Sequence, residues 1–191
     1  MMKKSDKKHQ SAAALPGDGT LEQRVEQMVR VDHAGEYGAV RIYQGQLAVL
    51  GESKSGDVIR HMLDQEKSHL KTFDKLVGDR QVRPTVLLPL WHLAGFALGA
   101  GTALLGEKAA MACTVAVEEA IDEHYSAQID VLEKTDFEPE LRKTFENFRE
   151  EERQHRQTGI DHGAEKTPAY ELLSAAIKNG SKMAIWLSTR L

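Results

Sequence analysis

The chain has a single cysteine, Cys113, among its 191 residues. It therefore cannot form an internal disulfide, and it lacks the several thiolates that structural zinc sites use. Cys113 lies in a run of Ala, Met, Thr and Val residues, so we expect it to be buried by packing and not to act as a nucleophile. A lone cysteine also favours a reducing compartment.

A strong excess of charge is missing too, because 25 Lys and Arg residues are set against 29 Asp and Glu residues, for a formal net charge of −4. No stretch combines basic residues with aromatic ones, which argues against nucleic acid as a partner. Residues 1–20 contain no apolar segment typical of a secretory signal and no arginine. We predict that residues 1–20 are a disordered tail and that residues 21–191 form one domain.

Alternating β-strand patterns are scarce, whereas helical periodicity is common along the chain. This periodicity predicts an all-α fold with four long helices. Their expected bounds are about Leu21–Leu50, Asp57–Val77, Glu107–Lys134 and Pro139–His162. Thr20 is a candidate N-cap of the first helix, and a fifth helix is expected from about Pro168 to the C-terminus.

Two Glu-x-x-His pairs stand out in these helices, Glu66 with His69 and Glu152 with His155. A single pair of this kind arises easily by chance, so its placement on the helix decides its value. Each pair interrupts the apolar stripe of its helix, and so does one glutamate on each of the other two helices, Glu36 and Glu118. Side chains three or four positions apart share a helix face, so all six groups are predicted to point inward.

Four inward carboxylates would be costly to bury and would repel one another unless cations lie among them. One Glu from each of two helices and a Glu-x-x-His from each of two others is the ligand pattern of a di-metal site in a four-helix bundle. The predicted metal ligands are Glu36, Glu66, His69, Glu118, Glu152 and His155. The Glu of each pair is the natural bridge between the two ions.

The donor set of carboxylates and imidazoles suits iron or manganese, and the spacing does not separate these two metals. The register also stays open at two places. Glu150 and Glu151 directly precede Glu152, and Glu119 follows Glu118. The apolar stripes favour Glu118 and Glu152.

Two aspartates near the predicted ligands have two interpretations each. Asp32 and Asp122 lie one turn from Glu36 and Glu118, so they are candidate acceptors for the ligating imidazoles or ordinary residues at the rim of the bundle. Tyr125 is predicted to border a substrate pocket. The remaining histidines are expected at the surface or rim; we place His33, His61, His92 and His162 there.

Residues 84–106, between the second and third bundle helices, contain no charged side chain. About 20 apolar residues can span a bilayer, but two prolines and four glycines interrupt this segment. A ferritin-like bundle needs one long crossover at this place. We therefore favour an apolar crossover with a membrane-facing side over a spanning helix, and Gly95 and Gly99 would permit close helix packing.

The last helix is also apolar. Leu172, Leu173, Ala176, Ile177 and Ala184 form a stripe, and residues 183–187 are apolar all round. Two interpretations stay open: a helix packed on the bundle, or a surface that docks on lipid or on a partner.

The motifs around these residues resemble the demethoxyubiquinone hydroxylase family. They are residues 30–39, 64–70, 113–119, 159–162, 168–170 and 185–191. The resemblance covers residues 21–191 and implies a ferritin-like, membrane-associated di-iron monooxygenase of ubiquinone biosynthesis with the same six ligands. Such an enzyme would use O2 to hydroxylate a polyprenylated demethoxy-benzoquinol, turning demethoxyubiquinol into demethylubiquinol.

The resemblance also suggests a location. Because the mitochondrial members' targeting segment is missing here, we expect a bacterial enzyme bound peripherally to the cytoplasmic face of the inner membrane. Other ubiquinone-biosynthesis proteins, or further copies of the chain, are possible partners. Two alternatives share the six ligands: a ferritin-like protein that oxidises and stores iron, and a non-catalytic quinone- or lipid-binding partner with a structural metal.

Overall fold

The structure, a computed structural model, describes residues 19–191 and contains only helices in that range. The helices are α1 (Leu21–Leu50), α2 (Gly56–Asp79), α3 (Leu88–Leu104), α4 (Glu107–Thr135), α5 (Pro139–Asp161), the short 3-10 helix η1 (Ala164–Lys166) and α6 (Tyr170–Arg190). The predicted all-α fold is confirmed, and the four predicted bundle helices match α1, α2, α4 and α5 to within one turn. The predicted tail lies outside the described residues apart from Gly19 and Thr20.

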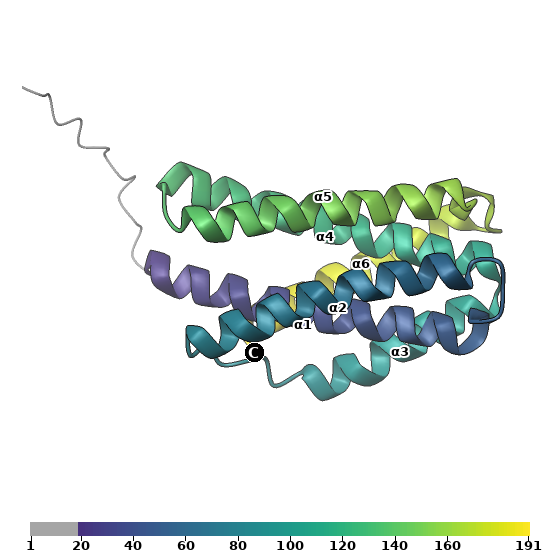
Figure 1. Cartoon of the computed structure of the whole chain (residues 1–191), viewed down its shortest axis with the longest axis horizontal. Helices are drawn as coiled ribbons and strands as arrows, with labels where there is room; N and C mark the ends of the chain where they lie inside the picture. Colours follow the sequence, from purple (N-terminus) through teal and green to yellow (C-terminus); the bar gives the residue numbers. More distant parts are fainter. Residues whose placement is uncertain (1–18) are drawn as a thin grey trace, which may run out of the picture.

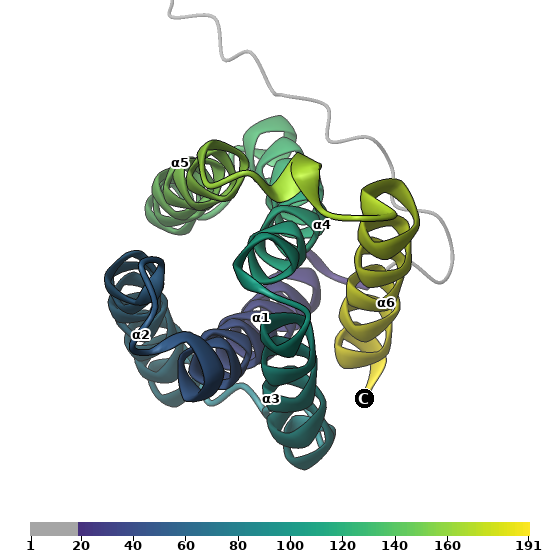
Figure 2. The same ribbon diagram turned by 90° about the vertical axis from the view of Figure 1, so that its right-hand side faces the viewer.

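The helices form two layers that share α1 and α4 (Figures 1 and 2). α1 packs against α2 and α3, whereas α4 packs against α5 and α6. Viewed along the bundle, α2 and α5 lie on one side of the α1–α4 pair and α3 and α6 on the other (Figure 2). The α1–α4 pair therefore belongs to the four-helix bundle. It also forms the wall between the interior of the bundle and an outer layer made of α3 and α6.

Local sequence signals set the helix ends. The Thr20 hydroxyl accepts a hydrogen bond from the Gln23 backbone N–H at 3.2 Å, and the Gln23 side chain accepts one from the Thr20 N–H at 2.9 Å. This reciprocal capping box confirms Thr20 as the N-cap of α1. Pro139 occupies the first turn of α5, where its missing N–H costs no hydrogen bond.

The uncharged crossover folds as helix α3 and packs closely on α1. A Cβ added at Gly99 would lie 1.9 Å from the Ile42 carbonyl oxygen, and one added at Gly45 would lie 2.2 Å from that of Phe96. Only glycine permits this approach, as the spacing of Gly95 and Gly99 predicts. Among residues 19–191, no helix combines the length and the apolar character needed to cross a membrane.

Two clusters of buried apolar side chains fill the bundle. One contains Ile59, Met62 and Met111, and the other contains Phe73 and Phe145. Along each bundle helix, the candidate metal ligands lie between the residues of these two clusters. The site therefore lies at the middle of the bundle, with one cluster of buried apolar side chains on each side. Cys113 is fully buried, as expected.

Candidate metal centre

The structure brings all six predicted ligands together in the middle of the bundle. Their side chains form two groups, and within each group one ligand atom per residue lies within 4.8 Å of the others. The groups are Glu36, Glu66, His69 and Glu152, and Glu66, Glu118, Glu152 and His155. None of the six residues is more than 4% exposed. Glu66 and Glu152 belong to both groups, which is the position that bridging ligands would take.

The structure turns Glu118 and Glu152 into the cluster and places the neighbouring glutamates outside it, which is the orientation that the apolar stripes favour. Glu119 lies on the outer face of α4, where its carboxylate pairs with Arg156 at 3.2 Å and with Lys178 at 3.0 Å. Glu150 is exposed. Glu151 faces the outer edge of an imidazole and is 38% exposed.

Both imidazoles turn their Nδ1 atoms toward the carboxylates. His69 Nδ1 lies 3.2 Å from Glu152 Oε1 and 3.4 Å from Glu36 Oε2. His155 Nδ1 lies 3.0 Å from Glu66 Oε1 and 3.2 Å from Glu152 Oε2. The Nδ1 lone pairs are therefore available at the centre of the cluster when the Nε2 atoms carry the protons.

The acceptors at the Nε2 atoms are not the predicted ones. His69 Nε2 lies 2.9 Å from Glu151 Oε2, and His155 Nε2 lies 3.1 Å from Gln65 Oε1.

The two predicted acceptors have other partners. Asp32 instead pairs with His124 at 3.0 Å, and Asp122 accepts hydrogen bonds from Arg149 and Arg153 at 2.7 Å each. Of the two interpretations of Asp32 and Asp122, that of acceptors for the ligating imidazoles is wrong. Asp32 on α1 points toward His124, and Asp122 on α4 points toward two arginines of α5, outside the cluster.

Two buried phenols hold the terminal carboxylates in a reciprocal arrangement. Tyr125 on α4 donates to Glu36 Oε1 on α1 at 2.5 Å, and Tyr43 on α1 donates to Glu118 Oε1 on α4 at 2.8 Å. Each tyrosine follows the glutamate of its own helix by seven residues. This shared spacing is a signal in the sequence for the role of both tyrosines. A place for Tyr125 at the border of a substrate pocket stays a prediction.

Burial and repulsion dominate the electrostatics of the cluster. Burial, followed by repulsion from Glu152, raises the pKa values of Glu66 and Glu118 well above the ordinary value for glutamate. Burial also raises the pKa of Glu36. Without a cation, burial therefore favours the protonated, uncharged forms of these three carboxyl groups.

Glu152 and the two histidines are shifted in the opposite sense to what burial alone would do. Burial would raise the pKa of Glu152, but the imidazoles of His155 and His69 beside its carboxylate lower it to about 2. Burial would lower the pKa of His69, but the nearby carboxylates of Glu152 and Glu36 raise it to about 12. The pKa of His155 is raised for the same reason, chiefly by Glu152. These shifts describe a cluster in which protonated imidazoles partly neutralise the carboxylates.

Several buried carboxylate oxygens and one imidazole nitrogen at the centre make close contacts but no hydrogen bond of normal geometry. They are Glu36 Oε2, both carboxylate oxygens of Glu66, Glu118 Oε2, Glu152 Oε1 and His69 Nδ1. Buried polar atoms are nearly always paired, so their convergence calls for an additional positively charged group. Oxygen and imidazole nitrogen atoms are ligands of iron and manganese, and the residues fit a pair of such divalent cations.

The other histidines divide between the surface and the interior. His61 and His162 are exposed as predicted. His92 is half-buried, with its Nδ1 atom 2.6 Å from the Tyr37 hydroxyl. The prediction for His33 is wrong, because this residue is 6% exposed and its Nε2 atom lies 3.0 Å from an oxygen of Asp74 on α2.

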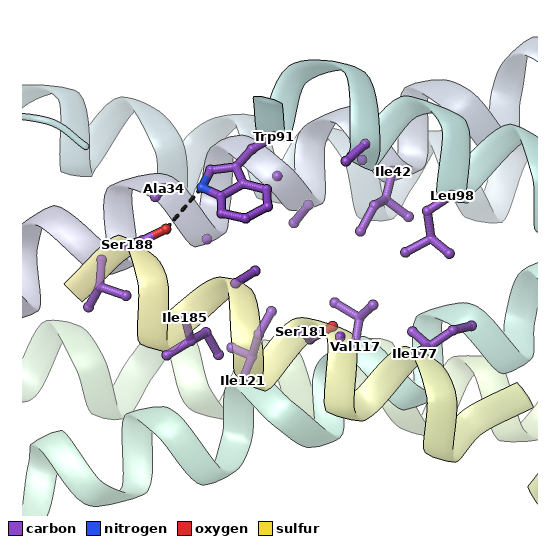
Figure 3. A pocket seen from close by; sticks show the side chains of 18 of the residues that line it. Ala34, Ile42, Trp91, Leu98, Val117, Ile121, Ile177, Ser181, Ile185 and Ser188 are labelled. Carbon is purple, nitrogen blue, oxygen red and sulfur yellow. Dashed lines mark hydrogen bonds between the residues drawn. The ribbon is translucent and has the colours of Figure 1, made fainter. Parts of the chain in front are cut away.

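An apolar cavity of about 470 Å³ lies on the other side of the α1–α4 wall, under α3 and α6 (Figure 3). Its wall includes Gly35 and Val117, which are the chain neighbours of Glu36 and Glu118. Trp91 and Ser188 close one end, and the Trp91 indole N–H donates to the Ser188 hydroxyl at 2.9 Å. Tyr125 does not line this cavity. Sequence patterns do not reveal it, because it forms only where four helices meet.

The family model described as ubiquinone biosynthesis protein COQ7 matches residues 23–188 of the chain. A Rhodospirillum rubrum protein named 3-demethoxyubiquinol 3-hydroxylase is 61% identical over 178 residues, which cover 93% of this chain and 83% of that protein. A human protein named NADPH-dependent 3-demethoxyubiquinone 3-hydroxylase, mitochondrial, is 57% identical over 87% of this chain and 78% of its own length. The resemblance seen in the motifs is thereby confirmed, and the chain belongs to the COQ7 family of ubiquinone biosynthesis proteins.

Proposed function

We propose that this chain is a di-iron monooxygenase that hydroxylates a polyprenylated demethoxy-benzoquinol with O2, converting demethoxyubiquinol into demethylubiquinol. The observation that carries the proposal is the pair of overlapping, buried carboxylate–imidazole groups. The names of the bacterial and human relatives describe the same hydroxylation. Side chains alone do not activate O2, and two iron ions would supply that chemistry when bound.

The six residues have separate roles in this proposal. Glu36 and His69 would hold one iron ion, Glu118 and His155 would hold the other, and Glu66 and Glu152 would lie between them. Tyr43 and Tyr125 fix the orientation of the terminal carboxylates by hydrogen bonds from their hydroxyl groups. The apolar clusters on either side exclude water from the reacting groups.

The apolar cavity suits the polyprenyl part of the substrate. Its wall contains few polar groups, and it extends between α1, α3, α4 and α6 (Figure 3). A prenyl chain in this cavity would gain roughly 25 cal/mol for each Å² of apolar surface removed from water. Because Gly35 and Val117 adjoin two of the metal-binding residues, the substrate's ring would approach the irons through this part of the wall.

Filling the cavity at Gly35 is expected to impair substrate use while the metal centre stays intact. A Cβ at Gly35 would have no heavy atom within 4 Å, so Gly35→Leu extends into the cavity without a backbone clash. We expect the KM for a demethoxyubiquinol with several prenyl units to rise by about tenfold, the order of a loss of 1.4 kcal/mol in binding.

The matched control is Gly78→Leu, because Gly78 also has open space around its Cβ position but does not line the cavity. Iron content and Tm of both variants should equal those of the parent. An unchanged KM for Gly35→Leu would contradict the assignment of the cavity to substrate.

Turnover by the iron-loaded chain tests the reaction itself. The protein is loaded with Fe(II) without oxygen, reduced, and exposed to oxygen-18 gas and a demethoxyubiquinol. One oxygen-18 atom in the new hydroxyl group of the product is the expected result. The two alternatives give other results: an iron store would take up far more than two ions per chain, and a binding protein would retain the quinol without consuming O2.

We also propose that α3 and α6 attach the chain to the cytoplasmic face of the bacterial inner membrane. Both helices border the cavity and expose large apolar side chains outward. These include Leu93 at 69% exposure, Leu104 at 74%, Leu172 at 74% and Trp186 at 54%. A surface of this kind favours an interfacial location next to the opening through which a prenyl chain would enter.

Flotation with vesicles of phosphatidylethanolamine and phosphatidylglycerol measures this attachment. The parent is expected to float with the vesicles, and Leu93→Gln with Trp186→Gln should reduce the floating fraction several-fold. Val49→Gln, an exposed apolar residue on α1, is the control and should float as the parent does. Equal flotation of all three proteins would contradict attachment through α3 and α6.

A further inference from the structure

The two imidazoles of the candidate metal centre have acceptors of different charge at their outer nitrogens. Glu151 on α5 accepts from His69 of α2, and Gln65 on α2 accepts from His155 of α5. Each acceptor directly precedes the Glu of its own Glu-x-x-His pair. The arrangement is reciprocal in position, but one acceptor is a carboxylate and the other a neutral amide.

The orientation of the Gln65 amide is fixed by the same contacts. Its Oε1 atom lies 3.1 Å from His155 Nε2, and its Nε2 atom donates to Glu151 Oε2 at 3.5 Å. Glu151 Oε2 therefore receives two hydrogen bonds, and a continuous chain of bonds links His69 to His155. Turning the amide over would lose both of its contacts.

The rest of the cluster is nearly symmetric. Each terminal glutamate accepts a hydrogen bond from a tyrosine of the opposite helix, and Glu66 and Glu152 are shared by both groups. The rings packed on the imidazoles differ, since Phe148 stacks on His69 at 4.0 Å whereas Tyr43 meets His155 edge-on at 6.1 Å. At the outer nitrogens of the two imidazoles, the charge difference comes from Glu151 and Gln65.

An acceptor with a negative charge makes an imidazole a stronger electron donor to a metal than a neutral acceptor does, and such outer partners change metal affinity by about 10- to 100-fold. We propose that Glu151 and Gln65 are positioning residues that make the two metal positions unequal, so that the position of Glu36 and His69 binds a divalent cation more tightly than that of Glu118 and His155. This inference rests on the proposed di-metal site.

Titration of the metal-free full-length chain with Mn²⁺, followed by calorimetry at one fixed pH, tests the inference. Mn²⁺ keeps its oxidation state and prefers the same oxygen and nitrogen ligands. The parent is expected to bind two ions in two steps that differ by about tenfold or more in affinity. Glu151→Gln should weaken the tighter step by a similar factor and bring the two steps together.

The exchanged variant, Gln65→Glu with Glu151→Gln, keeps the net charge and the paired acceptors. A change in the order of metal binding would therefore come from the location of the carboxylate and not from altered packing. Anomalous diffraction from crystals loaded with one Mn²⁺ per chain locates the first ion. In the parent it should lie beside His69, and in the exchanged variant it should lie beside His155. A purely structural role of these residues would change stability without moving the first ion.

The outcomes separate this inference from the proposal on which it rests. Two equal steps in the parent, or a first ion that stays beside His69 in the exchanged variant, would overturn the inference while leaving the di-metal site in place. A parent chain that binds no Mn²⁺ and no Fe²⁺ would overturn both.

Discussion

Replacing Glu66 by Gln is expected to abolish high-affinity iron binding and to lower quinol hydroxylation by more than about 100-fold, the upper end of what the loss of an outer partner costs. Glu66 belongs to both ligand groups and is fully buried, so an amide there removes one charge from both metal positions. The parent should retain about two irons per chain after anaerobic purification, as a site with six ligands of this kind holds. Elemental analysis measures the iron, and product formation measures the rate.

An ordinary mutation of a buried residue lowers the stability of a protein, but we do not expect Glu66→Gln to destabilise the metal-free chain. Without metal, burial raises the pKa of Glu66 well above its ordinary value and favours the protonated carboxyl group, which resembles glutamine in shape and charge. The metal-free Glu66→Gln protein should therefore melt at the same temperature as the metal-free parent or higher.

The control for the charge change is Glu150→Gln. Glu150 lies on α5 close to Glu152 in the sequence, but its side chain is exposed to solvent. It should keep both iron and activity. If Glu66→Gln binds as much iron as the parent, the assignment of Glu66 as a shared ligand is wrong. Glu66→Ala is a second test, since it removes the carboxyl group altogether.

The stabilisation that metal gives to the fold is expected to grow as pH rises. In the metal-free chain, the folded-state pKa values of Glu36, Glu66 and Glu118 lie above the ordinary value, mainly because of burial. The folded chain then binds more protons than the unfolded chain. These three groups therefore stabilise the metal-free fold most below about pH 4.5, and this contribution is lost as pH rises through their folded-state pKa values.

The histidines also make the metal-free fold less stable as pH rises, because the pKa of His69 is raised to about 12 and that of His155 is also raised. Glu152 acts in the opposite direction, since its pKa is lowered to about 2 and its contribution is lost only in acid. Two cations would replace the bound protons, so metal binding releases protons and strengthens with pH. Between about pH 5 and pH 8, the three glutamates with raised pKa values and the two histidines contribute more to the pH dependence of stability than Glu152 does.

Thermal unfolding of the metal-free and the metal-loaded protein across this pH range measures the effect. The difference in Tm between the two forms should increase from the acidic end to the alkaline end. Titrations in two buffers with different heats of ionisation should also detect the released protons. A Tm difference that does not vary with pH would contradict the electrostatic description of the cluster.

The bundle and its six inward residues were predictable because both follow from helical periodicity. A residue that interrupts an apolar stripe, such as Glu36 or Glu118, has its direction fixed by its neighbours on the same helix. The same reasoning favoured Glu118 over Glu119 and Glu152 over Glu151. Convergence of the six residues then needed only the assumption that four apolar faces pack together.

Contacts between helices were less predictable, and the errors show why. Asp32 and Asp122 lie on plausible faces, but the partner at the end of a side chain depends on the rotation of the opposite helix, which the sequence of one helix does not give. His33 is buried because α2 covers its side of α1, where it meets Asp74. Gln65 directly precedes Glu66, outside the ligand face, and only the packed bundle shows that it reaches His155.

The apolar helices α3 and α6 show a different limit of prediction from sequence. The lack of charge in residues 84–106 predicted a crossover that packs through Gly95 and Gly99, and α3 does so. The stripe of α6 was less informative, because Leu172 belongs to it and yet is 74% exposed, whereas Ile177 is buried. Hydrophobic patterns indicate which residues avoid water but not whether protein, lipid or substrate covers them.

X-ray diffraction at the iron absorption edge, from crystals of the chain loaded with Fe(II) under anaerobic conditions, is the most direct test of the metal centre. Two anomalous peaks should lie between Glu66 and Glu152, one beside Glu36 and His69 and the other beside Glu118 and His155. A fully loaded crystal with no iron among these six side chains, or with iron bound only at the surface, would contradict the account.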